Sequence, residues 1–246
     1  MAETQSANPR MINWARRQAK RAQDPALGAL MAPFLLERSA RDRVSMLTLP
    51  AADWAYERYL LSTHPDLHWA FVGLERDAAV AAAMATVGEH VLNADGTPAV
   101  CHARRTSTTE FIENENTRFD IVYFDYMGTW SKAKERDIQL LCQTPPGLYA
   151  CTIALNRGSS LTNSMLEECS VTGRRHLEWI QDTTGRYQQD PHYKITGTPE
   201  RIIALFNEQG VRAHMVGGFV YDSPSNSALA HVAEMTMVFR IGEPSR

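Results

Sequence analysis

The chain has 246 residues, of which 44% are hydrophobic and 22% are charged, and its formal net charge is -3. This composition is that of a globular protein and excludes collagen-like, low-complexity and wholly disordered chains. No apolar run approaches the roughly 18 residues that a membrane span needs, and the polar segment from Met1 to Arg10 lacks the pattern of a signal peptide. We therefore expect one large cytoplasmic domain without membrane contact.

Cysteine spacing and charge distribution limit the kinds of site. The four cysteines, Cys101, Cys142, Cys151 and Cys169, form no Cys-x-x-Cys pair, so we expect free thiols and no metal site. Residues 1–43 hold eight Lys or Arg and four acidic residues, which leaves this segment at +4 and the rest of the chain at -7. The asymmetry suggests a basic face that contacts nucleic acid, and the alternative is an ordinary solvated surface.

The N-terminal part of the chain predicts two helices. Residues 8–23 show helical spacing of small and apolar residues, and Asp24-Pro25 predicts the end of that helix. A second, more apolar helix is expected over residues 26–41. We interpret residues 1–42 as a helical extension that packs on a larger domain, residues 43–246.

From residue 43 the pattern alternates between strands and helices. Strands are expected over 44–49, 69–74, 100–103, 119–125 and 148–155, with helices over 51–62, 78–87, 109–114 and 131–142 between them. Asp77 and Ser131 are the expected N-caps of two of these helices. Such alternation is typical of a parallel α/β sheet, and the apolar run over 119–125 is typical of a strand buried on both faces.

The last third of the chain departs from this alternation. Residues 157–198 are interpreted as an inserted segment, with helices near 165–168 and 174–181. Thr198 and Pro199 predict the N-cap and first position of a final helix that ends at Gly210. Strands over 211–221 and 230–241 then predict an antiparallel hairpin.

Alternating strands and helices closed by a C-terminal hairpin resemble the class I S-adenosylmethionine-dependent methyltransferases. The resemblance covers roughly residues 43–241, and the segment Met235–Ile241 looks like the last strand of that family. It implies a Rossmann-like, seven-stranded, mostly parallel sheet with one antiparallel strand, preceded here by the N-terminal helical extension. It also implies S-adenosylmethionine as cofactor.

The resemblance places the cofactor at two turns. The turn after the first strand is usually glycine-rich in this family; here it is Leu49-Pro-Ala-Ala-Asp53, and the resemblance makes Leu49, Pro50 and Ala51 cofactor-binding residues. The second strand ends at Glu75-Arg76, where a carboxylate can accept hydrogen bonds from both ribose hydroxyls. The alternative for Glu75 is a surface residue that caps the next helix.

The third position is the loop Asp125-Tyr-Met-Gly-Thr-Trp130. It is similar to the Asp-Pro-x-Gly-(Ser/Thr)-Pro loop of tRNA guanine-N2 methyltransferases and, more distantly, to the (Asp/Asn)-Pro-Pro-Tyr loop of amino-group DNA methyltransferases. The resemblance implies that Asp125 faces both cofactor and acceptor, that Asp125 and Tyr126 are catalytic, and that an aromatic ring stacks on a base. The expected substrate-binding residues are Gly128, Thr129 and Trp130. In the alternative interpretation Asp125 caps the following helix.

The leading hypothesis is methyl transfer from S-adenosylmethionine to an exocyclic amine of a nucleic-acid base, with tRNA or DNA as partner. The competing hypothesis keeps the fold without catalysis, as a binding or regulatory protein that contacts nucleic acid or a protein, and the glycine-poor first turn favours it. A nicotinamide-dependent oxidoreductase needs Gly-x-Gly-x-x-Gly after the first strand, which is missing.

Overall fold

The computed structural model describes residues 18–39, 42–93, 95–126, 128–157, 177–179, 192–224 and 231–242. The helices are α2 (Gln18–Leu36), α3 (Ala55–Thr63), α4 (Ala78–Gly88), α5 (Thr108–Asn114), α6 (Lys132–Leu141) and α9 (His192–Glu208). The strands are β1 (Arg43–Thr48), β2 (His68–Glu75), β3 (Val100–Arg105), β4 (Ile121–Asp125), β5 (Leu148–Arg157), β6 (Leu177–Trp179), β7 (Arg212–Pro224) and β8 (His231–Gly242).

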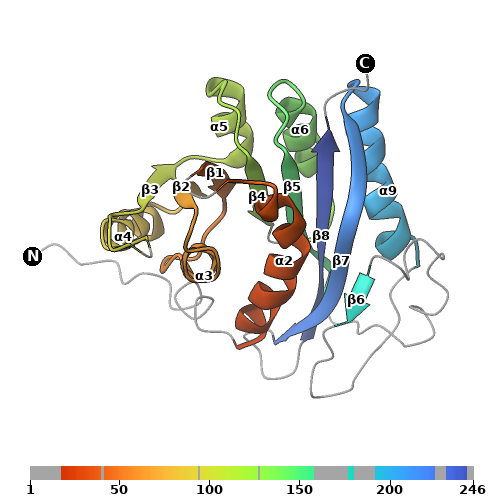
Figure 1. The fold of residues 1–246 in the computed structure, drawn as a ribbon. Coiled ribbons are helices and arrows are strands. Elements are labelled where there is room, and N and C mark those ends of the chain that lie inside the picture. The colour runs from red at the N-terminus through yellow and green to blue at the C-terminus, as the bar shows by residue number, and fades with distance from the viewer. Residues whose placement is uncertain are drawn as a thin grey trace, which may run out of the picture.

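The strands form one sheet in the order β3-β2-β1-β4-β5-β8-β7-β6 (Figure 1). Its neighbours pair in parallel except around β8, which is antiparallel to both β5 and β7. The predicted Rossmann-like, mostly parallel sheet with a C-terminal antiparallel hairpin is therefore confirmed. The short edge strand β6 adds an eighth strand to the seven that the resemblance implies.

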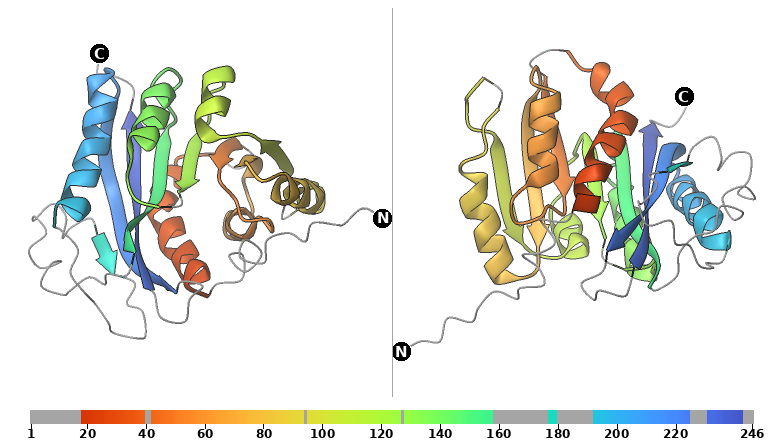
Figure 2. Two further views of the ribbon diagram at one scale, coloured as in Figure 1. Left: turned by 180° about the vertical axis from the view of Figure 1, so that it is seen from behind. Right: turned by 90° about the horizontal axis from the view of Figure 1, so that it is seen from below.

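Two apolar cores lie on opposite faces of the sheet. Helices α2, α3 and α4 cover one face, and α5, α6 and α9 cover the other (Figure 2). The strand β4 shows the division, because Ile121 and Tyr123 pack into the first core while Val122 and Phe124 pack into the second. Each strand residue thus alternates between two buried faces, which explains why β4 and β5 have nearly continuous apolar sequences.

The helix α2 corrects the prediction of a helix break at Asp24-Pro25. It runs without interruption from Gln18 to Leu36 and contains Pro25 and Pro33. An internal proline removes a helical hydrogen bond at a cost of about 3 kcal/mol. Leu27 and Met31 are residues of this helix, and both are fully buried against the sheet. Burial of each such side chain contributes roughly 1.5–3 kcal/mol, so this packing offsets the cost of an internal proline. Residues 8–17 of the predicted first helix lie outside the described residues.

Three further boundaries differ from prediction. Helix α3 begins at Ala55 rather than at residue 51, because Trp54 has the left-handed φ of 54° and cannot continue a helix. Helix α9 begins at His192, so Thr198 and Pro199 lie inside it rather than at its start; both are buried, and packing holds them in helical conformation. The helix predicted around 174–181 is wrong at Leu177–Trp179, which pairs as β6 with the open edge of β7. The boundary at residue 42 and the insertion over 157–198 stay predictions.

Candidate functional site

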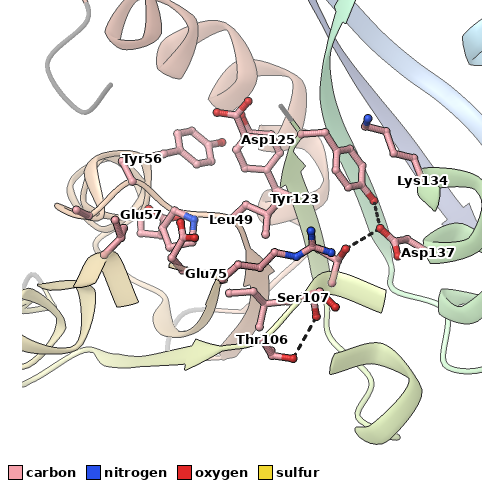
Figure 3. Close-up of a pocket in the computed structure, with 18 of the residues that line it drawn as sticks. Leu49, Tyr56, Glu57, Glu75, Thr106, Ser107, Tyr123, Asp125, Lys134 and Asp137 are labelled. Carbon is pink, nitrogen blue, oxygen red and sulfur yellow. Dashed lines mark hydrogen bonds between the residues drawn. The ribbon is translucent and has the colours of Figure 1, made fainter. Parts of the chain in front are cut away.

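A cavity of about 460 Å³ lies at the carboxyl ends of β1, β2 and β4 (Figure 3). This edge of a parallel sheet is where ligands bind in open α/β folds. All six residues expected to bind cofactor line it: Leu49, Pro50, Ala51, Glu75, Arg76 and Asp125. In Figure 3, residues from α3 lie on one side of the cavity and residues from α6 on the other, with β4 between them.

The first turn reaches the cavity without glycine. Pro50, Ala51 and Ala52 line the cavity, and the turn closes through a 3.0 Å hydrogen bond from Trp54 N to Ala51 O. The Trp54 indole is fully buried, and its Nε1 donates to Met84 O at 2.8 Å. The turn is thus anchored by a buried aromatic residue next to its cavity-lining part.

The space for this turn comes from a glycine on the neighbouring strand. A Cβ at Gly73 in β2 would lie 2.6 Å from Pro50 Cγ, 2.6 Å from Trp54 Cη2 and 2.9 Å from Met84 Cε. These separations are too short for any side chain, so β2 needs glycine here. This requirement could not be predicted from the sequence, because Gly73 lies inside a strand and not in the turn.

Glu75 ends β2 as predicted and is half-buried. Its Oε1 accepts a 2.8 Å hydrogen bond from Asp77 N. Asp77 is the N-cap of α4, and its Oδ1 accepts from the backbone N of Ala79 and Val80 at 2.8 and 3.0 Å. The predicted cap at Asp77 is therefore confirmed, and Glu75 is held beside the cavity by the residue that caps the helix.

The loop after β4 is fixed to β5 by its backbone. Tyr126 N donates to Thr152 O at 3.0 Å, and Gly128 O accepts from Ala154 N at 3.1 Å. Gly128 has a φ of +92°, which a side chain would strain. Asp125 is half-buried at the start of this loop, and Ser131, not Asp125, occupies the N-cap position of α6, although the Ser131 side chain makes no cap hydrogen bond.

Tyr126 lines the cavity but is buried, with its hydroxyl donating to Asp137 Oδ2 at 2.9 Å. Burial, followed by the nearby Asp137 charge, raises the pKa of Tyr126 well above its usual value. Asp137 also accepts from Thr108 Oγ1 at 2.7 Å and Thr109 Oγ1 at 2.5 Å. This buried carboxylate therefore joins the start of α5, α6 and the β4 loop.

The three expected substrate-binding residues are not among the residues that line the cavity. Thr129 O accepts from Lys134 Nζ at 2.6 Å, and desolvation lowers the pKa of Lys134. Trp130 Nε1 donates to Glu135 Oε1 at 3.3 Å. Arg201 of α9 binds both carboxylate oxygens of Glu135, at 3.2 and 3.1 Å, and this pairing is the main cause that lowers the pKa of Glu135.

Sequence reasoning missed several residues that line the cavity. The segment from Thr106 to Thr109 follows β3 and belongs to a stretch without clear periodicity. Gln23 comes from α2, where the prediction placed a helix end. Asp137 and Lys134 lie on the inner side of α6, and both are buried.

Glu57 is the least expected of these residues. It is 1% exposed on α3, and its Oε1 accepts from Thr48 Oγ1 at 2.8 Å. Burial raises the pKa of Glu57 to about 7, with smaller upward effects of Asp24 and Asp53. Glu57 precedes the buried Leu60 and Leu61 by three and four residues, a helical spacing that places it on the apolar face of α3. That spacing is the signal that could have identified it.

Two classes of site find no support in the described part of the chain. No group of three or more His, Cys, Asp or Glu side chains there is arranged to hold a metal ion. No helix among the described residues is both long and apolar enough to cross a membrane. Cys151 is a buried free thiol on β5, whereas Cys169 lies outside the described residues.

Comparison with known proteins gives likeness at the level of structure. No protein-family model matches the chain, and no curated protein matches its sequence. Trm5b from Pyrococcus abyssi is 11% identical, with a TM-score of 0.47 over 87% of this chain and 48% of its own, so this chain spans about half of that protein. A SAM-dependent methyltransferase from Agrobacterium tumefaciens is 10% identical, with a TM-score of 0.47 over 89% of this chain and 62% of its own.

A third structure, precorrin-6y C5,15-methyltransferase from Geobacter metallireducens, is 9% identical, with a TM-score of 0.42 over 86% of this chain and 85% of its own. Likeness at this level supports no inference about activity. The sheet of this chain, with its one antiparallel strand β8 inside a C-terminal hairpin, is the one that the resemblance implied. The chain therefore has the class I methyltransferase fold.

Proposed function

We propose that the chain is an S-adenosylmethionine-dependent methyltransferase that acts on an exocyclic amine of a nucleic-acid base. One observation supports this most. The three segments to which the resemblance assigned ligand binding come from β1, β2 and β4, far apart in the sequence, and residues of all three line one cavity.

The cavity fits the proposed cofactor in size and in chemistry. Its volume of about 460 Å³ falls within the range of roughly 300–1,000 Å³ that small-molecule sites occupy. Glu75 at the end of β2 offers a carboxylate to ribose hydroxyls, and Pro50 and Ala51 bring the first turn against the cavity. Two buried oxygens, Gln23 Oε1 and Glu57 Oε2, also have no hydrogen-bond donor among the described residues and can accept one from a ligand.

The cofactor, when bound, supplies a methyl group that its sulfonium already activates. The protein therefore needs to align the acceptor and exclude water rather than form a covalent bond. Asp125 accepts N–H bonds of the acceptor amine in this proposal and so directs the nitrogen lone pair toward the methyl group. Trp130, held by Glu135, offers an indole beside the same loop for stacking on a base.

The competing proposal is a binding or regulatory protein of the same fold. The absence of glycine from residues 49–53 raises this alternative, although Gly73 on β2 leaves room for Pro50 and Trp54 behind the turn. The two proposals differ in whether the cavity binds the cofactor and whether Asp125 supports turnover.

The first test is calorimetric titration of the purified protein with S-adenosylmethionine and with S-adenosylhomocysteine. We expect micromolar binding, and Glu75→Ala should weaken it about tenfold or more, since a hydrogen bond to a charged group contributes ~1.5–3 kcal/mol. Asp125→Ala should keep cofactor binding and lose methyl transfer to tRNA or DNA. A folded wild-type protein that binds neither ligand rules out the methyltransferase and leaves the binding protein.

A further inference from the structure

The wall of the cavity formed by α2 and α3 contains acceptor oxygens that have no donor. Among the described residues, Glu57 Oε2 and Gln23 Oε1 are buried side-chain atoms without a hydrogen-bond partner. Glu57 is 1% exposed and Gln23 is 4% exposed, and both line the cavity. Buried acceptors nearly always have a donor, so these two oxygens point to a ligand that brings one.

The charge of the cavity indicates what kind of donor fits. Among the described residues that line it, five carry carboxyl groups, Asp24, Glu57, Glu75, Asp125 and Asp137, and two carry cations, Arg76 and Lys134. Lys134 already donates to Thr129 O, and Arg76 is exposed in the bend between β2 and α4. A cationic donor therefore gains at the wall that holds Asp24 and Glu57, and the carboxylate of an amino acid bound there would have to point away from this wall.

We propose that Glu57, together with Gln23, binds the protonated amine of the cofactor's amino-acid portion. The inference rests on the proposed function and names the part of the ligand that this wall recognises. The proposed contact to the ligand's amine comes from Gln23 of α2 and Glu57 of α3 and not from the glycine-poor first turn.

The surroundings of Glu57 explain why a proton is involved. Asp24 from α2 and Asp53 from the turn before α3 face it with negative charge, and Thr48 from β1 donates to its Oε1. Tyr56 of α3 and Cys101 of β3 also lie near enough for the Glu57 charge to raise their own pKa values. Within the part of the chain that the structure describes, no lysine, arginine or histidine lies close enough to lower the pKa of Glu57.

The pKa of Glu57 is raised to about 7, so near neutral pH about half of the molecules carry the proton in the free protein. An ammonium group at hydrogen-bond distance favours the ionised carboxylate. On binding, the O–H proton of the neutral fraction passes to the buffer, and the carboxylate then accepts an N–H bond from the ligand's ammonium group.

The test compares two ligands that share the adenosine thioether. S-Adenosylhomocysteine carries the amino-acid portion, and 5′-methylthioadenosine does not. Each is titrated by calorimetry at pH 7 into wild-type protein, Glu57→Gln and the control Glu89→Gln, in two buffers of different ionisation enthalpy. Glu89 is exposed at the end of α4, away from the cavity lining.

We expect wild type and Glu89→Gln to release about half a proton on binding S-adenosylhomocysteine and none on binding 5′-methylthioadenosine. Glu57→Gln should bind S-adenosylhomocysteine about tenfold or more weakly, release no proton, and bind 5′-methylthioadenosine as wild type does. The amide is neutral and of the same size, so the variant should fold; a thermal unfolding transition checks this.

Two results overturn the proposal in distinguishable ways. If Glu57→Gln keeps the wild-type affinity and proton release for S-adenosylhomocysteine, the amine is bound elsewhere and the proposed function stands. If the folded wild type binds neither ligand, the proposed function fails and the assignment of Glu57 fails with it. Gln23→Leu provides a second variant, with the same selective loss for S-adenosylhomocysteine expected.

Discussion

Gly73, the glycine on β2 beside the first turn (residues 49–53), leads to a sharp prediction. In Gly73→Ala, the added methyl would lie 2.6 Å from both Pro50 Cγ and Trp54 Cη2, and 2.9 Å from Met84 Cε. The Trp54 ring has no room to withdraw, because it is fully buried and its Nε1 is bonded to Met84 O at 2.8 Å. The backbone of the turn must therefore shift.

Overpacking of a buried site typically costs about 1–3 kcal/mol. For a chain of this size, each kcal/mol lowers the melting temperature by about 2–4 °C, so Gly73→Ala should melt roughly 2–12 °C below wild type. Because Pro50 lines the cavity, S-adenosylhomocysteine binding should weaken as well.

The matched control is Gly242→Ala at the end of β8, where the nearest atom to a new Cβ is Arg212 O at 4.0 Å. Differential scanning calorimetry and ligand titration on both variants separate a local clash from a general effect of alanine. Equal melting temperatures for the two variants would refute the reasoning that Gly73 makes room for the turn.

Three further predictions concern stability. Trp54→Phe keeps an aromatic ring but removes the buried hydrogen bond from the indole Nε1 to Met84 O and part of the packed ring, so denaturant titration should show a loss of about 1–3 kcal/mol; an unchanged midpoint would contradict this. The carboxyl of Glu57 has a pKa of about 7 in the folded protein against 4.5 in a free side chain. Its contribution to the free energy of unfolding is therefore fully present below pH 4.5 and is lost as the pH rises through 7. At about 1.4 kcal/mol for each tenfold change in the proton equilibrium, this loss is roughly 3 kcal/mol, which urea titrations at pH 4.5 and 8 should detect in wild type and find absent in Glu57→Gln. In Asp137→Asn an NH₂ group replaces either Oδ2, which accepts from Thr108 and Tyr126, or Oδ1, which accepts from Thr109, so the variant should lower stability by about 1–3 kcal/mol, whereas Glu113→Gln at the surface should change it by less than about 1 kcal/mol.

The succession of strands and helices along the chain follows closely from its pattern of apolar and polar residues. Strands such as β4 are apolar on both faces and could only belong inside a covered sheet. The errors fall where tertiary packing outweighs local rules. Pro25 and Pro199 both look like helix boundaries, yet both lie within helices whose neighbouring residues are buried against the sheet.

Some residues of the candidate site could likewise be predicted from the sequence, and others depend on tertiary packing. Leu49, Glu75 and Asp125 could be predicted because each follows or ends a parallel strand, and the carboxyl ends of such strands meet at one edge. Glu57 and Gln23 lie inside helices, and only the packing of α2 and α3 brings them to the cavity. A helical position shows which face a residue occupies but not which helix covers it.

The first turn shows why glycine content alone is a weak guide to ligand binding. For a ligand to approach a turn closely, the turn needs small side chains on the side of the ligand. It also needs room on its other side for its larger side chains. Here Ala51 and Ala52 meet the first need by lining the cavity, and Gly73 on β2 meets the second by leaving space for Pro50 and Trp54. The room that a glycine in the turn would provide comes here from Gly73 on the neighbouring strand, so the composition of residues 49–53 does not favour a binding protein over an enzyme. Titration of the cavity with cofactor separates the two, and Glu57→Gln then shows which wall recognises the amine.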